Sequence, residues 1–288
     1  MDWNIVGHDW AVKMLKQHIE SGQTRHAYLF AGPEGIGRRS LALRFAQSIN
    51  CNNVNEQLES CGECRICRQF ERMQHPDMTV IECVEGSQSI KVDQIRDLQR
   101  TISLTPIEAK FRIAMLLNFQ HATESAQNAL LKTLEEAPSR VILLVTVDAV
   151  DHLLPTIISR CEILRMRTMP VDRLECHLAE HLPVSEDEAA VFASASGGRI
   201  GEAISLIAEP EKAQRRKQWI ETLLEMVKAD RVERMKYAEK NFRYGREVLR
   251  QAMQVWLTFW RDVLMFALEG ESAKLIHVDF TEQIMELN

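Results

Sequence analysis

The sequence predicts an α/β fold built on a parallel sheet, followed by an all-helical part. Two patterns predict this: apolar strand-like runs alternate with amphipathic helices between residues 27 and 147, and the strand pattern stops after Cys161. With 45% hydrophobic and 26% charged residues, the composition is that of a globular protein. At 288 residues the chain is long enough to divide into several domains.

The first element pair is a strand, a loop and a helix. Residues 27–31 (AYLFA) form a short apolar run that predicts a buried strand. A loop punctuated by glycine follows over residues 32–37, and the next run is helical, with apolar residues at 41, 43, 45 and 46. We therefore expect a β-loop-α unit at residues 27–49.

The same order of elements returns in the second half of this region. Residues 111–119 (FRIAMLLNF) predict a strand, and residues 123–137 predict a helix with Thr123 as its N-cap and Pro138 just beyond its end. Residues 141–147 (VILLVTV) predict another buried strand. Strands joined through helices run parallel, so we expect helices on both faces of the sheet.

The remainder of the chain reads as helices. Runs at 171–182, 185–196 and 199–208 are separated by Pro183 and by two consecutive glycines, and further helices are expected over 211–288. We therefore predict three domains: an α/β domain at 1–166, a small helical domain at 167–208 and a second helical domain at 209–288.

Charge and the N-terminus limit the cellular setting. A formal net charge of -6 argues against a chain that coats nucleic acid by bulk electrostatics, so any DNA contact must be local. The sequence opens without a basic, then apolar, targeting segment, and no apolar run is long enough to span a membrane. We expect a cytoplasmic protein without membrane contact.

A degenerate phosphate-binding loop follows the first strand. Residues 32–39 (GPEGIGRR) keep the spacing of the G-x-x-x-x-G-K-[ST] motif between a strand and a helix. Arg38 replaces the lysine that reaches phosphate, Arg39 replaces the hydroxyl that binds Mg²⁺, and Ser40 comes one position too late. The loop serves only as a turn, holds ATP or ADP unhydrolysed, or hydrolyses ATP. Its candidate nucleotide-binding residues are Gly32, Gly35, Gly37, Arg38, Arg39 and Ser40.

The end of the second predicted strand argues against hydrolysis. A phosphate-loop ATPase needs a carboxylate there to hold Mg²⁺, and usually a second acid to orient the attacking water. This strand ends Leu116-Leu117-Asn118-Phe119, without either acid. The lysine, the hydroxyl and the acids are all missing, so we expect an ATPase scaffold without its chemistry.

Four of the seven cysteines cluster in the sequence, at Cys51, Cys61, Cys64 and Cys67. An odd total in a chain without an export signal argues against disulfides, and four thiolates at this spacing suit tetrahedral Zn²⁺. A site closed by four sulfurs leaves no position for water, so the predicted role of zinc is structural. An iron–sulfur cluster and four free thiols are the alternatives.

Further motifs carry a resemblance to a known family. They are His75-Pro76-Asp77, Val92-Asp93-Gln94-Ile95-Arg96, residues 127–136 (QNALLKTLEE) and residues 153–161 (LLPTIISRC). With the altered loop and the cysteines, these residues resemble the clamp-loader subunits of bacterial DNA polymerase III, in the AAA+ superfamily. The resemblance covers roughly residues 4–165, and the helical remainder matches mainly in layout. In that family the gamma/tau subunits keep the lysine and the acids, and the delta-prime branch, which this sequence resembles, has degraded ones.

The resemblance implies roles for residues and partners. Arg160 of the Ser159-Arg160-Cys161 motif would be an arginine finger that enters the ATP site of a neighbouring subunit; Thr146 lies near the first-sensor position, and Ile200 replaces the lid arginine. Residues 167–208 would be the lid, and residues 209–288 a collar that joins five subunits and looks short for the family. Implied partners are gamma/tau and delta subunits, the beta sliding clamp and, through the complex, primer-template DNA in the nucleoid-associated replisome.

Three functional hypotheses follow. The leading one is a subunit of the polymerase holoenzyme without activity of its own, which works by geometry and by contributing Arg160. The second is a divergent gamma/tau-like ATPase that uses Arg38 as its phosphate-binding cation. The third, a zinc-dependent DNA-binding module, is disfavoured because residues 51–73 hold three arginines against four glutamates.

Overall fold

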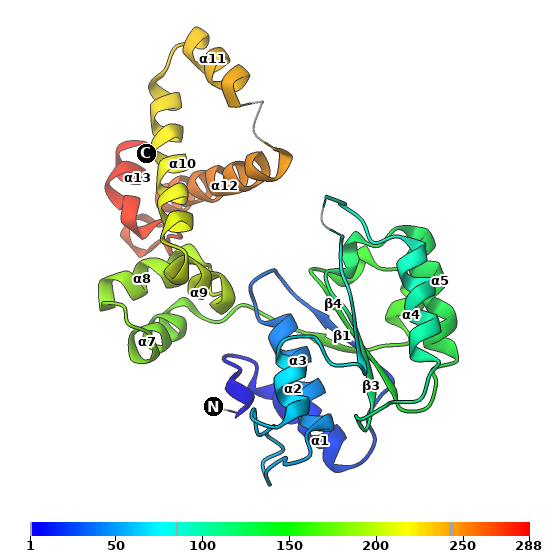
Figure 1. The fold of residues 1–288 in the computed structure, drawn as a ribbon. Helices are drawn as coiled ribbons and strands as arrows, with labels where there is room; N and C mark the ends of the chain where they lie inside the picture. The colour runs from blue at the N-terminus through cyan, green and yellow to red at the C-terminus, as the bar shows by residue number, and fades with distance from the viewer. Residues whose placement is uncertain (1, 85, 242–244) are drawn as a thin grey trace. The chain divides into compact units, whose positions relative to one another are not determined.

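The computed structural model describes residues 2–84, 86–241 and 245–288, which form two compact units, Met1–Thr168 and Met169–Asn288 (Figure 1). The first unit holds a parallel sheet with helices, and the second unit is helical. The predicted fold class is therefore confirmed. The finer division of the helical part into domains at 167–208 and 209–288 stays a prediction.

The sheet of the first unit has five strands in the order β2-β3-β4-β1-β5, and every neighbouring pair is parallel. Strands β1 and β4 have the expected bounds. Strand β3 is shorter than expected because Asn118 adopts a left-handed conformation, with φ of 50°, and a 3-10 turn begins at Phe119. The strands are β1 (Ala27–Ala31), β2 (Met78–Ile81), β3 (Arg112–Leu116), β4 (Val141–Val147) and β5 (Glu162–Arg165).

The two edge strands, β2 and β5, were not predicted from the sequence. The expectation that no strand follows Cys161 was wrong, because β5 pairs with β1 directly after it. Both edge strands have only four residues, and β5 begins at Glu162 and ends at Arg165. A four-residue strand carries little apolar signal, and in β5 the two charged ends reduce it further, so periodicity could not distinguish these strands from loops.

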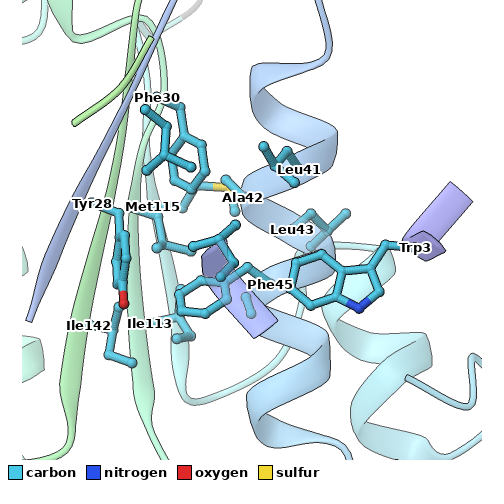
Figure 2. Packing of buried hydrophobic residues seen from close by; sticks show 14 of the residues in the cluster. Trp3, Tyr28, Phe30, Leu41, Ala42, Leu43, Phe45, Ile113, Met115 and Ile142 are labelled. Carbon is cyan, nitrogen blue, oxygen red and sulfur yellow. The ribbon is translucent and has the colours of Figure 1, made fainter. Parts of the chain in front are cut away.

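Helices cover both faces of the sheet because the side chains of each strand alternate between two cores. Tyr28 and Phe30 face one core, where they pack with Phe45 of α2, and Leu29 faces the other. Figure 2 shows Tyr28 and Phe30 opposite the apolar residues of α2. The helices of this unit are α1 (Asp9–Glu20), α2 (Arg38–Asn50), α3 (Arg65–Glu71), α4 (Val92–Ile102), α5 (Glu124–Glu135) and α6 (Pro155–Ile158).

The second unit is built from helices α7 to α13. Ser185 caps α8 with a capping box that includes Glu188, and the longest helix, α12, packs its buried Phe259 into a core with Ile220 of α10. None of the described helices is both long and apolar enough to span a bilayer. The helices are α7 (Val171–His181), α8 (Glu186–Ala195), α9 (Ile200–Ala208), α10 (Pro210–Lys228), α11 (Arg231–Asn241), α12 (Arg246–Glu269) and α13 (Thr281–Glu286).

Candidate functional site

The glycine loop joins β1 to the N-terminus of α2, as the motif requires. A Cβ atom at Gly32 would lie 2.6 Å from the carbonyl oxygen of Met166, so only glycine fits where the loop passes the end of β5. Gly37, the residue before α2, has a φ of 102°, a conformation that favours glycine. The backbone of a phosphate-binding loop is therefore retained.

The two altered positions of the loop and of β3 contact each other. Arg38 is only 6% exposed, and its Nη2 donates a hydrogen bond of 3.1 Å to Oδ1 of Asn118. The backbone N–H of Asn118 in turn donates to Oγ1 of Thr146 at 2.8 Å. Arg38 thus binds the residue that stands where a magnesium-binding acid is expected, and Thr146 braces that residue.

Arg39 and Ser40 do not join this contact. Both are exposed. Nη2 of Arg39 lies 3.2 Å from the sulfur of Met73, a residue that follows α3. Asp148 was not predicted from the sequence; its carboxylate acts electrostatically on Arg38 from the loop after β4. Although burial opposes it, hydrogen bonding from His152 and from Ala149 N–H lowers the pKa of Asp148, so it is an anion at neutral pH.

The Arg160 side chain is held by residues of two family motifs. Its Nη2 donates to Oε1 of Glu135 at 2.8 Å, and its Nη1 donates to the carbonyl oxygen of Thr156 at 3.0 Å. The side chain remains 35% exposed and Glu135 52% exposed. Arg160 is therefore oriented on the surface of the first unit by an ion pair that water can reach.

A buried amide fixes the loop before α6, on which the position of Arg160 depends. Gln127 of α5 is 7% exposed, and its Oε1 accepts the backbone N–H of Leu154 at 2.9 Å. Its Nε2 donates to the carbonyl oxygen of His152 at 3.3 Å. Gln127, near the start of α5, and Glu135, at its end, therefore connect this helix to residues 152–160.

The cysteine cluster joins the end of α2 to α3. Cys51 directly follows α2, Cys64 is the N-cap of α3, and Cys67 lies inside α3. All four sulfurs, including that of Cys61, lie within 4.8 Å of one another. His75 lies outside this group: its Nδ1 accepts the backbone N–H of Asp77, and its ring packs on Phe70. The four cysteines can therefore bind a metal ion.

The donor set fits a tetrahedral thiolate site. Sulfur–sulfur distances of 3.6 Å (Cys51 to Cys61) and 4.0 Å (Cys61 to Cys67) bracket the roughly 3.8 Å that Zn–S bonds of about 2.3 Å require. The backbone N–H of Cys64 lowers the pKa of Cys61 to about 7, and burial raises the pKa of Cys51 and Cys67. Buried thiols with raised pKa values need a cation to become thiolates, and a divalent metal supplies one.

The role of the His75-Pro76-Asp77 motif was not foreseen. Asp77 is completely buried, and its carboxylate accepts three backbone N–H bonds of 2.8–2.9 Å from residues 107–109. It also pairs with the buried Arg112 at 3.0 Å. The carboxylate thus holds the loop between α4 and β3 against the start of β2. In the sequence, the only signal for this role was the motif His75-Pro76-Asp77 itself.

Replacing Asp77 by alanine is expected to destabilise the first unit by about 3–5 kcal/mol, because the buried charge of Arg112 and three amide groups lose their partner. Urea unfolding followed by circular dichroism measures this loss. The matched control is Asp97→Ala, whose exposed pair with Arg100 is worth at most about 1 kcal/mol. Equal destabilisation by both changes would contradict the role of Asp77.

The same group predicts a pH dependence. Burial raises the pKa of Asp77, but the N–H groups of residues 107–109 and the Arg112 guanidinium outweigh burial and hold it below the ordinary value of 3.8. Its contribution to stability is therefore complete above that ordinary value and is lost as the pH falls through the lower folded-state pKa. Acid unfolding of Asp77→Asn, compared with that of the wild type, should lack this loss.

Comparison with known proteins identifies relatives. Residues 7–170 match the family model described as "DNA polymerase III, delta subunit". DNA polymerase III subunit delta' of Bacillus subtilis is 30% identical over 96% of this chain and 82% of its own length, and delta' of Pseudomonas aeruginosa is 37% identical over 53% of this chain and 46% of its own. Subunit tau of Bacillus subtilis is 31% identical over 71% of this chain, which spans 36% of that longer protein.

Proposed function

The chain belongs to the delta' family of DNA polymerase III clamp-loader subunits, and from this we propose that it is a non-hydrolysing AAA+ subunit that completes the ATP site of a neighbour. Its partners would be gamma/tau and delta subunits, and the assembly would load the beta sliding clamp onto primer-template DNA in the nucleoid. The observation that carries the proposal is the contact between Arg38 and Asn118, because it uses the two positions on which hydrolysis depends.

The absence of hydrolysis follows from the chemistry of these side chains. Nη2 of Arg38 donates its hydrogen bond to Asn118, whereas a catalytic lysine reaches the β/γ oxygens of ATP. The carboxamide of Asn118 is neutral and holds Mg²⁺ far less well than a carboxylate. Arg39 offers no oxygen ligand, and it lies toward Met73. The loop and the end of β3 thus lack the lysine, the hydroxyl and the carboxylate on which hydrolysis depends.

Arg160 would act in the ATP site of the adjacent subunit. A guanidinium supplied in trans neutralises the charge that develops on the γ-phosphate, and it must be oriented before the subunits meet. Glu135 holds Arg160 in an exposed ion pair, and Gln127 fixes the preceding loop. When a phosphate replaces Glu135 as partner, the arginine exchanges one anion for another, so an unpaired charge never has to be buried.

Zinc would be the structural cofactor at the four cysteines. Bound there, it would link Cys51 at the end of α2 to Cys64 and Cys67 of α3 and would supply no chemistry beyond this cross-link. ATP or ADP bound without hydrolysis is not required by the proposed role. The retained glycine loop would then be kept for its turn and for its close approach to Met166.

The second unit would provide the lid and the collar. Helix α12 buries Phe259 against α10, and on its other side it exposes five large apolar residues at spacings of four, three, four and four. Such spacing is typical of a helix face that packs on a partner helix. We assign this face to contact with collar helices of the other subunits. The five residues are Met253, Leu257, Trp260, Leu264 and Leu268.

The competing function is ATP hydrolysis by this chain, as in gamma/tau. One observation favours it: Nη1 of the buried Arg38 has no hydrogen-bond partner among the described residues and could donate a hydrogen bond to a phosphate oxygen. Hydrolysis measured with the purified chain alone, and then with gamma/tau, delta, clamp and primed DNA, distinguishes the two. ATP hydrolysis by the purified chain alone would refute the non-hydrolysing role. No hydrolysis by the chain alone, together with hydrolysis by the mixture, supports it.

Replacing Arg38 by alanine is expected to leave the DNA-stimulated turnover of the reconstituted loader within about twofold of wild type, because Arg38 binds Asn118 rather than a reacting phosphate. Arg38→Lys is the paired variant, and it should gain no hydrolysis, since Arg39 still replaces the magnesium-binding hydroxyl. Circular dichroism checks that each variant is folded. A collapse of loader turnover in the folded alanine variant would contradict this expectation.

A further inference from the structure

The arginines of the cysteine module gather on one face of α3. Arg65, Arg68 and Arg72 line a surface depression of about 300 Å³, together with the carboxamides of Gln69 and Gln74. All three arginines are exposed, and their spacing of three and four residues places them side by side on a helix surface. No acidic residue lines this depression. The net negative charge of residues 51–73 therefore does not describe this face.

Two of the four glutamates of the module are engaged away from the depression. Glu71, the acid within α3, accepts from Arg44 at 2.9 Å and from Gln47 at 2.8 Å, on the side that faces α2. Glu59 accepts from Asn55 at 2.9 Å within the preceding loop. Folding thus directs these two acids to other partners, while the three arginines line the depression.

Two of the three guanidinium groups have no side-chain partner among the described residues. Arg65 lies 3.4 Å from Glu108, but in the part of the chain that the structure describes neither Arg68 nor Arg72 forms a side-chain ion pair or hydrogen bond. The side-chain oxygen of Gln69 is buried without a partner there, so its carboxamide can turn its N–H₂ group toward a ligand. The depression therefore presents unpaired cations with amide groups between them, which is a site for an anion.

We propose that this face of α3 binds the phosphodiester backbone of DNA. Guanidinium groups and amides are the donors that phosphate oxygens accept, often in pairs. A protein partner would need apolar anchors at the centre of its interface, and none lines this depression. The contact is local, as the net charge of -6 requires. The choice of DNA among polyanions rests on the proposed function.

The test is fluorescence anisotropy of labelled single-stranded and primed-duplex DNA with the purified full chain, in salt from about 50 to about 200 mM. Arg68→Gln/Arg72→Gln is expected to weaken binding several-fold. Loss of two phosphate contacts should also flatten the slope of log K against log salt by about 1.4 for single strands and about 1.8 for duplex. Arg96→Gln/Arg100→Gln is the matched control, because these exposed arginines of α4 are paired with Asp93 and Asp97.

Three outcomes would overturn the proposal. In the first, DNA affinity and the salt slope are the same in the Arg68/Arg72 variant as in the wild type. In the second, the Arg96/Arg100 control loses as much DNA affinity as the Arg68/Arg72 variant, which would mean that only bulk charge acts. Poly-L-glutamate could bind in an Arg68-dependent manner while DNA does not, which would assign the face to an acidic protein. Because DNA binding is measured without ATP or partners, the Arg160→Ala variant should bind DNA like the wild type. Failure of the proposed DNA contact is therefore distinct from failure of the proposed function.

Discussion

Cys61→Ser is expected to abolish binding of about one equivalent of zinc and to unfold the segment that joins α2 to α3. The sulfur of Cys61 lies 3.6 Å from that of Cys51 and 4.0 Å from that of Cys67. Its loss therefore removes one of the four thiolate ligands of the tetrahedral site. Structural zinc contributes about 10–16 kcal/mol in small zinc-finger peptides, far more than a seven-residue helix gains from its own hydrogen bonds. This is therefore the largest effect expected from a single substitution.

Metal analysis and limited trypsin digestion measure these two consequences. Trypsin should cut the variant at Arg65 and Arg68, which lie in α3 and are protected when this helix is folded. Cys83→Ser is the matched control, because Cys83 is equally half-buried and lies outside the cluster. A wild-type chain that is folded and free of metal, or a Cys61→Ser variant with wild-type protection of α3, would contradict the zinc assignment.

Arg160→Ala is expected to reduce turnover about 10³-fold or more at the neighbouring ATP site that it completes, because an arginine finger is worth about 10³–10⁵ in rate. Assembly should stay intact, since the contacts that the structure describes for Arg160, with Glu135, Ser159 and the carbonyl oxygen of Thr156, are exposed and lie within its own unit. Lysine should not rescue turnover, because an ammonium lacks the planar fork that binds two oxygens. The measurement is DNA-stimulated ATP hydrolysis by the reconstituted loader.

Arg25→Ala is the matched control for this loss. Arg25 is also an exposed arginine of the first unit, and it lies 3.7 Å from Glu162 on β5. Gel filtration of both variants with gamma/tau and delta verifies that the loader assembles. If the assembled Arg160→Ala loader hydrolyses ATP as the Arg25→Ala loader does, Arg160 is not a finger and its pair with Glu135 is only structural.

The sequence alone predicted the elements whose pattern is local. Residues 27–31 and 141–147 are continuous apolar runs, and the structure has strands with those bounds. The hydroxyl of Thr123 accepts the backbone N–H of Ala126, as expected of an N-cap. These predictions succeeded because periodicity, caps and turns depend on residues within a few positions of one another. The cysteine spacing belongs to the same class, since three of its members lie on one tight turn and the start of α3.

Tertiary structure decided which side chains meet. Arg38 and Asn118 are 80 residues apart, and they meet only because β1 and β3 both flank β4 in the sheet. Arg160 was expected at a surface, but its partner Glu135 depends on how α5 packs beside α6. Asp77 was noticed only as part of a motif, because its partners come from a loop about 30 residues later in the chain.

The charge of the cysteine module shows the difference most plainly. Its sequence determined how many arginines and glutamates it holds, and the count disfavoured contact with DNA. The rotation of α3 against α2 decided that Glu71 faces Arg44 while Arg68 and Arg72 face outward. A count adds charges wherever they lie, whereas a ligand senses only those within about a Debye length on the face it approaches, and folding alone assigns residues to faces.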